Sequence, residues 1–155
     1  MSAEARIAEL GLELPEAPKP AGTYSPVVQI GDTLYVSGHG PLRKDGTLIT
    51  GRVGDDLSED EGRQAARQTG LTILATLRKN LGSLDRIGRI VKVLGMVNAN
   101  ADFTRHPQVI NGFSDLMVEI FGESGRAARS AVGMGSLPGN IAVEIEAIVQ
   151  LKPGA

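Results

Sequence analysis

The feature that most constrains the fold is residues 127–150, where two segments alternate between apolar residues and polar or small ones. Alternation with a period of two is typical of β-strands that bury one face. The run GSLPGN at residues 135–140, rich in turn formers, separates the two segments. The pattern therefore predicts two strands joined as a hairpin.

The register of this hairpin brings charged residues together. A loop over residues 136–139 would place Arg129 opposite Glu146. The same register places Ala131 opposite Glu144, within reach of long side chains on that face. A guanidinium with small neighbours and carboxylates nearby suits a small carboxylate ligand. The residues alone leave open the alternative of a cross-strand salt bridge on a solvated face.

Composition narrows the class of protein. A chain of 155 residues with 41% hydrophobic and 22% charged residues is typical of one soluble domain. The net charge of −2, without a basic tract, disfavours nucleic acid as the main partner. There is no cysteine, and the two histidines lie too far apart in sequence to suggest a metal site. With no membrane-spanning run and no signal peptide, we expect a cytoplasmic protein.

The expected elements follow from periodicity and from helix and turn signals. Residues 1–21, with three prolines, are expected to form an N-terminal arm, and residues 22–155 a single domain. Residues 58–61 (SEDE) form a capping box ahead of a long apolar stripe. In order, the patterns predict a helix at 3–12, strands at 27–32 and 33–39, a short strand at 47–53, a helix at 59–81, a strand at 87–97 and a helix at 106–121.

This order predicts an α+β fold with a mixed sheet and two helices packed on one face. Alternation along residues 33–39 places Tyr35, Ser37 and His39 together on one face. The strand at 87–97 is apolar on both of its faces. Something must therefore cover the sheet face that the helices leave free, and a second subunit is the natural candidate.

Several motifs resemble those of the RidA/YjgF family of imine deaminases, of which this chain looks like a divergent subgroup. They are GTYSP at 22–26, IGDTLYVSG at 30–38, ARS at 128–130, LP at 137–138 and VEIEA at 143–147. The resemblance implies a chorismate-mutase-like fold of the bacillus type and a homotrimer with sites in the clefts between subunits. It also implies hydrolytic deamination of reactive 2-imino or 2-enamino acids to 2-keto acids and ammonia, without a metal or organic cofactor.

The resemblance assigns catalytic roles to two residues. Arg129 matches the arginine that clamps the substrate carboxylate, and Glu144 matches the glutamate that positions or activates the attacking water. Glu146 lies on the same face as Glu144, and only the motif favours Glu144 over it.

Four further residues match substrate-binding positions of the family: Tyr24, Gly38, Asn111 and Ala131. The first three also have a purely structural reading: a tyrosine packed between prolines, a glycine at a strand-end bulge and an exposed helical asparagine. Ala131 replaces a cysteine that many family members carry, so only a main-chain role remains there.

Two other functions remain open at this stage. The same arginine could belong to a non-catalytic protein that binds a keto acid or another small carboxylate as a regulator. The family has also been labelled a ribonuclease or translation inhibitor, which the net charge of −2 argues against.

Overall fold

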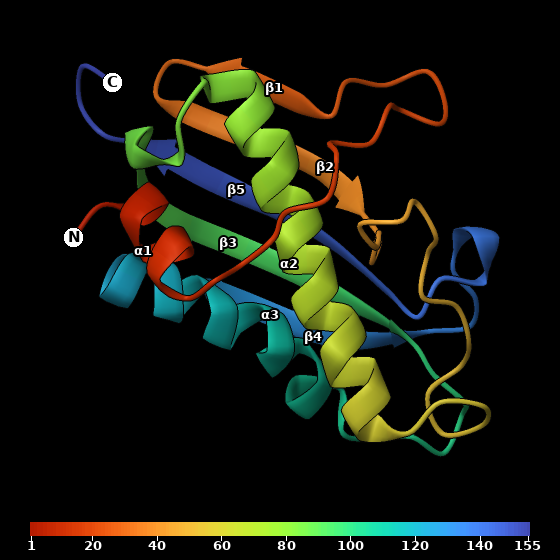
Figure 1. The fold of residues 1–155 in the computed structure, drawn as a ribbon. Helices are drawn as coiled ribbons and strands as arrows, with labels where there is room; N and C mark the ends of the chain where they lie inside the picture. The colour runs from red at the N-terminus through yellow and green to blue at the C-terminus, as the bar shows by residue number, and fades with distance from the viewer.

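The structure, a computed structural model, describes residues 1–155 and contains a five-stranded sheet in the order β1-β2-β5-β3-β4 (Figure 1). The strands are β1 (Val27–Ile30), β2 (Thr33–His39), β3 (Ile87–Asn98), β4 (Ala128–Met134) and β5 (Val143–Leu151). The helices are α1 (Ala3–Glu9), α2 (Glu59–Leu81) and α3 (His106–Phe121), with short 3-10 turns at Leu84–Arg86, Gly122–Gly125 and Pro138–Asn140. The α+β class, the mixed sheet and the two long helices on one face are confirmed.

The predicted hairpin between the last two strands is wrong, because β3 lies between them. β4 pairs with β3 in parallel, and β5 pairs with β3 on its other side in antiparallel fashion. Arg129 is the partner of Val93, while Glu144 is the partner of Met96. Arg129 and Glu146 are therefore not cross-strand neighbours, and neither are Ala131 and Glu144.

The connection from β4 to β5 explains this arrangement. The buried Asn98 amide, at the end of β3, donates to Asn140 Oδ1 at 3.0 Å and to the Ile141 carbonyl at 3.1 Å. These bonds hold the connection against the end of β3, so that the chain passes β3 before it re-enters the sheet. Turn-forming residues predict that a chain turns, but they do not specify which strand it joins next.

The short strand predicted at 47–53 is also absent. This segment makes only isolated bridges, Leu42 with Leu48 and Thr50 with Ile141 among them. Gly46 and Gly51 have φ values of +87° and +128°, which an extended strand does not accommodate.

Helix α2 begins and ends where the sequence predicts. The Ser58 hydroxyl accepts from the Glu61 N–H at 3.1 Å, and the Glu61 carboxylate accepts from the Ser58 N–H at 2.7 Å, which completes the capping box. Gly82 ends the helix in the left-handed conformation, with φ of +82°. None of the helices combines the length and the apolar character needed to cross a bilayer.

The N-terminal arm is anchored to the body of the protein at its first helix. Ala3 and Ile7 of α1 are buried in the main core cluster. The Glu4 carboxylate accepts two hydrogen bonds from the Arg78 guanidinium, at 3.1 and 2.6 Å, and a third from the Leu84 N–H. The following residues then cross the helical layer in front of α2 on the way to β1 (Figure 1).

The opposite face of the sheet carries no helix. Val28, Tyr35 and Val132 lie on this side and are 48%, 46% and 37% exposed. A shallow hollow of about 400 Å³ on the same face is lined mainly by apolar residues, among them Leu94 and Ile148. An apolar surface of this kind on one sheet face is typical of an interaction surface.

Gly112→Ala should strongly destabilise the fold. A Cβ at position 112 of α3 would lie 2.0 Å from the Arg63 carbonyl oxygen of α2, so the two helices would have to separate. We expect the free energy of unfolding to fall by about 2–3 kcal/mol or more in urea denaturation. Gly135→Ala, where a Cβ meets no atom within 4 Å, is the matched control and should change it by less than about 0.5 kcal/mol. Equal losses for the two variants would contradict this account of the helix contact.

Candidate functional site

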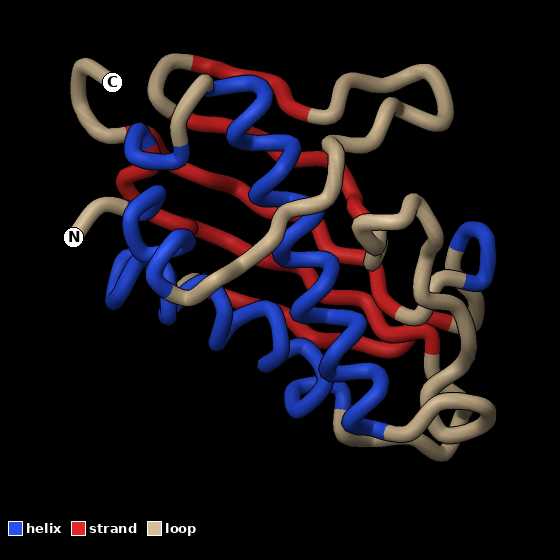
Figure 2. Tube along the Cα trace, viewed as in Figure 1, coloured by secondary structure: helices blue, strands red, loops and turns tan.

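Three of the six residues predicted to be catalytic or substrate-binding line one cavity of about 770 Å³, namely Tyr24, Gly38 and Glu144. The cavity lies at the end of β2, on the side of the molecule where the longer loops gather (Figure 2). Residues 18–22 of the arm form one wall and the carboxylates of β5 another. The arm is thus part of this site, which its sequence did not indicate.

Gly38 is in close contact with Glu144. A Cβ at position 38 would lie 3.0 Å from Glu144 Cδ and 3.2 Å from Cγ, closer than ordinary van der Waals contact. A larger residue would therefore push the carboxylate away. The absence of a side chain lets the backbone of β2 lie directly against the acid.

A β-bulge creates this contact. Val36 pairs with Ala147 and His39 pairs with Ile145, so two residues of β2 lie opposite the single residue Glu146. The bulge interrupts the alternation along β2. The prediction that His39 shares a face with Tyr35 and Ser37 is wrong, because His39 is buried, with 6% of its surface exposed.

The segment that directly follows the arm is bonded to β2 beside the cavity. The Ser37 hydroxyl donates to the Ser25 carbonyl at 2.6 Å, and the Ser37 N–H donates to the Pro26 carbonyl at 3.0 Å. Tyr24 is half exposed, and its hydroxyl accepts from the Ala21 N–H at 3.3 Å. The Tyr24 hydroxyl hydrogen therefore remains free to donate to a ligand.

Glu144 has the electrostatics expected of a base. Burial raises the pKa of its carboxyl above the ordinary value, and the neighbouring charge of Glu146 raises that pKa further. Glu146 is exposed and lines the hollow on the open sheet face as well as the cavity. Only Glu144 of the pair combines partial burial, contact with Gly38 and a raised pKa.

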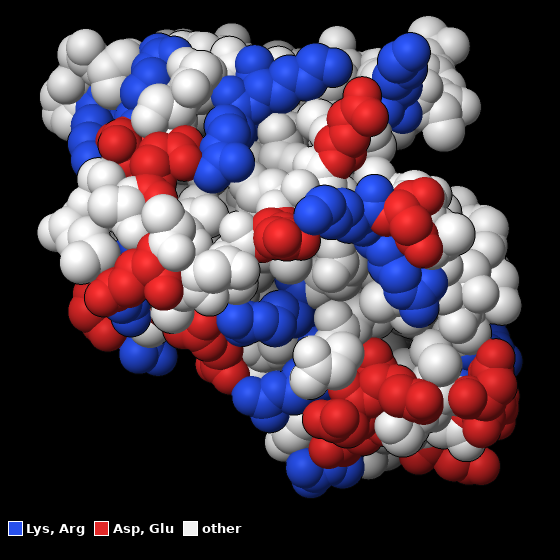
Figure 3. All heavy atoms as spheres, in the orientation of Figure 1, with Lys and Arg blue, Asp and Glu red and all other residues white.

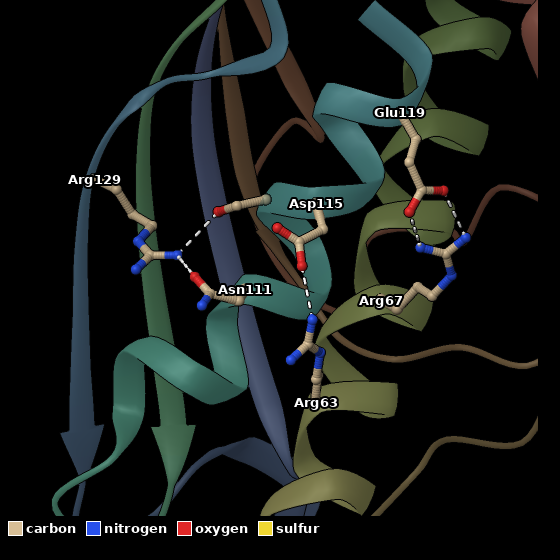
Figure 4. Close-up of polar contacts among 7 residues, drawn as sticks. Arg63, Arg67, Asn111, Asp115, Glu119 and Arg129 are labelled. Atoms are coloured by element: carbon tan, nitrogen blue, oxygen red, sulfur yellow. Dashed lines mark hydrogen bonds and ion pairs between the residues drawn. The ribbon is translucent and has the colours of Figure 1, made fainter. Parts of the chain in front are cut away.

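Arg129 and Asn111 form a second cluster at the edge of the sheet (Figure 4). Arg129 Nη1 donates to Asn111 Oδ1 at 2.8 Å and to Ser114 Oγ at 3.1 Å. Ser114 was not identified from sequence, although its position three residues after Asn111 on α3 places it on the same helix face. Ala131 lies two residues after Arg129, on the same face of β4.

Arg129 differs from its neighbours in having no carboxylate partner. In Figure 4, Arg63 is paired with Asp115, and Arg67 makes two bonds to Glu119. The ion pairs of the structure do not include Arg129, so the cross-strand salt bridge considered from sequence is wrong. Its Nε and Nη2 make no hydrogen bond within the protein and remain available as a planar fork.

The two clusters do not meet within one chain. Arg129 points to the helical side of the sheet, where it contacts α3, while Glu144 points to the other side, towards the cavity. β4 and β5 are separated by β3, which adds about 10 Å between strand axes. The predicted convergence of the guanidinium and the carboxylates on one face is therefore wrong for a single protomer.

No group of three acidic or histidine side chains is placed to hold a metal ion.

Glu144→Gln should stabilise the folded chain at neutral pH. A carboxyl whose pKa is raised on folding favours the folded state below its unfolded pKa of about 4.3 and loses that contribution as pH rises through the folded pKa. The amide of the variant stays neutral at every pH, so the variant does not lose stability as pH rises. Urea denaturation should therefore show a gain for the variant near pH 8 that shrinks towards about pH 4. A gain that is constant with pH, or larger in acid, would contradict the burial of this carboxylate.

Comparison with known proteins agrees with the motifs. Residues 4–150 match the family described as "YjgF/chorismate_mutase-like, putative endoribonuclease". Protein TCP17 of Trypanosoma cruzi is 43% identical over 149 residues, which is 96% of this chain and 93% of that protein. The 2-iminobutanoate/2-iminopropanoate deaminase of Dermatophagoides farinae is 33% identical over 142 residues, which is 91% of this chain and 95% of that enzyme.

A solved structure supports the same assignment. A protein of unknown function from Agrobacterium tumefaciens has a TM-score of 0.89 to this chain at 41% identity, over 97% of this chain and 92% of that one. The fold, the motifs and these relatives together show that the chain belongs to the YjgF/RidA family.

Proposed function

We propose that this protein hydrolyses reactive 2-imino or 2-enamino acids to 2-keto acids and ammonia, in a cleft between two subunits of a homotrimer. The observation that carries the proposal is the state of Arg129. Asn111 and Ser114 hold its guanidinium through Nη1 alone, while Nε and Nη2 have no protein partner. A fixed guanidinium with two free parallel donors matches the geometry of a carboxylate.

The separation of the two clusters supports a site shared between subunits. One chain presents Arg129 at its β4 edge and Glu144 on its open sheet face. A second copy whose edge approaches that open face would bring its own Arg129 towards Glu144 of the first. The exposed apolar residues Val28, Tyr35 and Val132 give such a contact a hydrophobic driving force. Three copies related by rotation would close the arrangement.

The chemistry in this cleft follows from the groups present. Arg129 would bind the substrate carboxylate, and main-chain groups at Gly38 and Ala131 would orient the imine nitrogen. Glu144, as a carboxylate, would take a proton from water while the oxygen attacks C2. The electron pair of the C=N bond moves to nitrogen, which takes up the proton that Glu144 accepted from water. In the resulting carbinolamine the hydroxyl then passes its proton to the amine through Glu144, the C–N bond breaks, and the keto group forms as ammonia leaves.

The relatives and the surface favour this function over a ribonuclease. A relative at 33% identity is named an iminobutanoate and iminopropanoate deaminase. On the helical side of the molecule, basic and acidic side chains are interspersed and form no continuous basic patch (Figure 3). Binding to a phosphate backbone requires concentrated positive charge.

Ala131 favours one alternative, a non-catalytic protein that binds a keto acid. The residue offers no side-chain group for chemistry, so the cleft could hold a ligand without transforming it. Glu144→Gln separates the two functions. In an enzyme the variant should lose turnover and retain binding of 2-oxobutanoate. In a binding protein the variant should bind 2-oxobutanoate as tightly as the wild type does.

Arg129→Ala should abolish most of the acceleration of imine hydrolysis. Loss of a bidentate, charge-assisted contact costs about 2–3 kcal/mol, which corresponds to a fall of roughly 30- to 150-fold in kcat/KM. Keto-acid release from freshly generated 2-iminobutanoate measures this effect. Arg63→Ala, in an exposed ion pair with Asp115, is the matched control and should retain activity. A wild-type protein that gives no acceleration with small, acidic or aromatic imines would disprove the deaminase function.

Mixed oligomers test the shared cleft directly. Arg129→Ala and Glu144→Gln should each be inactive alone, yet subunits unfolded and reassembled together should regain activity, because some clefts then combine an intact arginine with an intact glutamate. Random mixing in equal amounts should restore about a quarter of the wild-type activity of a trimer. Sites contained within one chain would show no recovery, and an ultracentrifugation mass of one subunit would exclude the trimer.

A further inference from the structure

His39 is a buried histidine with both ring nitrogens engaged, and the proposed chemistry does not use it. Its Nδ1 lies 2.6 Å from the Ser37 carbonyl oxygen, and its Nε2 lies 2.8 Å from the Thr76 hydroxyl in the middle of α2. Thr76 is itself only 1% exposed. The imidazole of His39 therefore links the Ser37 carbonyl of β2 to Thr76 of α2, the helix that packs behind the sheet.

His39 forms a hydrogen bond across the β-bulge in which Gly38 contacts Glu144. The bond from its ring to Ser37 spans Gly38 and therefore fixes the backbone on both sides of the glycine. The clearance at Gly38 is small, since a Cβ there would already be 3.0 Å from Glu144 Cδ. Any change in the shape of the bulge would shift the surface against which the carboxylate rests.

We propose that His39 is a positioning residue, which together with Thr76 holds the β2 bulge so that Gly38 and Glu144 keep their places in the cavity. The expected effect on kcat rests on the proposed function. The hold of His39 on Gly38 and Glu144 does not depend on that function. Both ring nitrogens of His39 are engaged within the protein, so it acts through Gly38 and Glu144 rather than on the reacting atoms.

The hydrogen bonds define one tautomer. The Ser37 carbonyl can only accept, so Nδ1 carries the proton, and in the neutral ring Nε2 accepts from the Thr76 hydroxyl. Burial lowers the pKa of His39 below its ordinary value, which keeps the ring neutral. Thr76, the contact of the ring on α2, is uncharged, as is its β5 partner Ile145. The charged groups that line the same cavity are Lys19, Glu144 and Glu146.

Thr76→Val is the most direct test, because valine keeps the volume of threonine and removes the hydroxyl. We expect kcat for imine hydrolysis to fall by about 10- to 100-fold while KM stays within about twofold, since Arg129 still binds the carboxylate. Thr69→Val is the matched control. Thr69 is fully buried on the same helix, and its hydroxyl donates only to the Ala65 carbonyl at 2.9 Å. This control should leave kcat unchanged.

The pH profile provides a second readout. Glu144 must be deprotonated in the working site, so the acid limb of log kcat should follow its raised pKa and should move to lower pH in Thr76→Val but not in Thr69→Val. His39→Gln retains an uncharged donor and acceptor, and it should keep kcat near neutrality within roughly threefold of the wild type.

A third readout does not depend on turnover. Carboxyl resonances followed by NMR report the pKa of Glu144, which should move from its raised value towards the ordinary range in Thr76→Val but not in Thr69→Val. An unchanged Glu144 pKa together with an unchanged kcat in Thr76→Val would overturn the positioning role. Equal losses in Thr76→Val and Thr69→Val would also overturn it, since they would indicate general destabilisation. A wild-type protein without deaminase activity would disprove the proposed function, and the NMR titration would still decide the role of His39.

Discussion

The pairing of β3 on both of its edges is the constraint on which the rest of the structure depends. Because β3 accepts β4 in parallel on one side and β5 in antiparallel fashion on the other, it decides which face each charged residue occupies. Asn98 secures this order by binding the β4–β5 connection at the end of β3. Arg129 consequently reaches the helical side of the sheet and Glu144 the open side. The two groups that the proposed chemistry needs are thus present in one chain but lie apart in it.

Local contacts orient the functional group in each half of the candidate site, Arg129 in one half and Glu144 in the other. At the β4 edge, Asn111 and Ser114 occupy one nitrogen of Arg129 and leave the others free, which orients the guanidinium without neutralising it. At the end of β2, the bulge and Gly38 place the backbone against Glu144, and burial makes that carboxyl a stronger base. Orientation before binding reduces the entropy lost when the substrate binds. The oligomer proposed above would then only have to bring two prepared surfaces together.

The N-terminal arm contacts the core at its first helix and the candidate cavity at its other end. Its first helix is held by buried Ala3 and Ile7 and by the Glu4–Arg78 pair, and its later residues form a wall of the cavity before Ser25 and Pro26 bond to Ser37. Anchoring at both ends reduces the freedom of the intervening prolines and glycines. The arm therefore contributes to the shape of the cavity.

The sequence by itself determined the class of fold and the long helices and strands, but not the absence of the short strand predicted at 47–53. The capping box at Ser58, the glycine after α2 and the apolar stripes of both long helices are local patterns, and local energetics are enough to place them. The motifs around Arg129 and Glu144 likewise identified the family. Only the tertiary structure decided the order of the strands, the burial of His39 behind the bulge, the partnership of Arg129 with Ser114 and the use of the arm as a cavity wall. These features depend on contacts between residues far apart in the chain, and a period of two in a strand specifies its faces but not its neighbours.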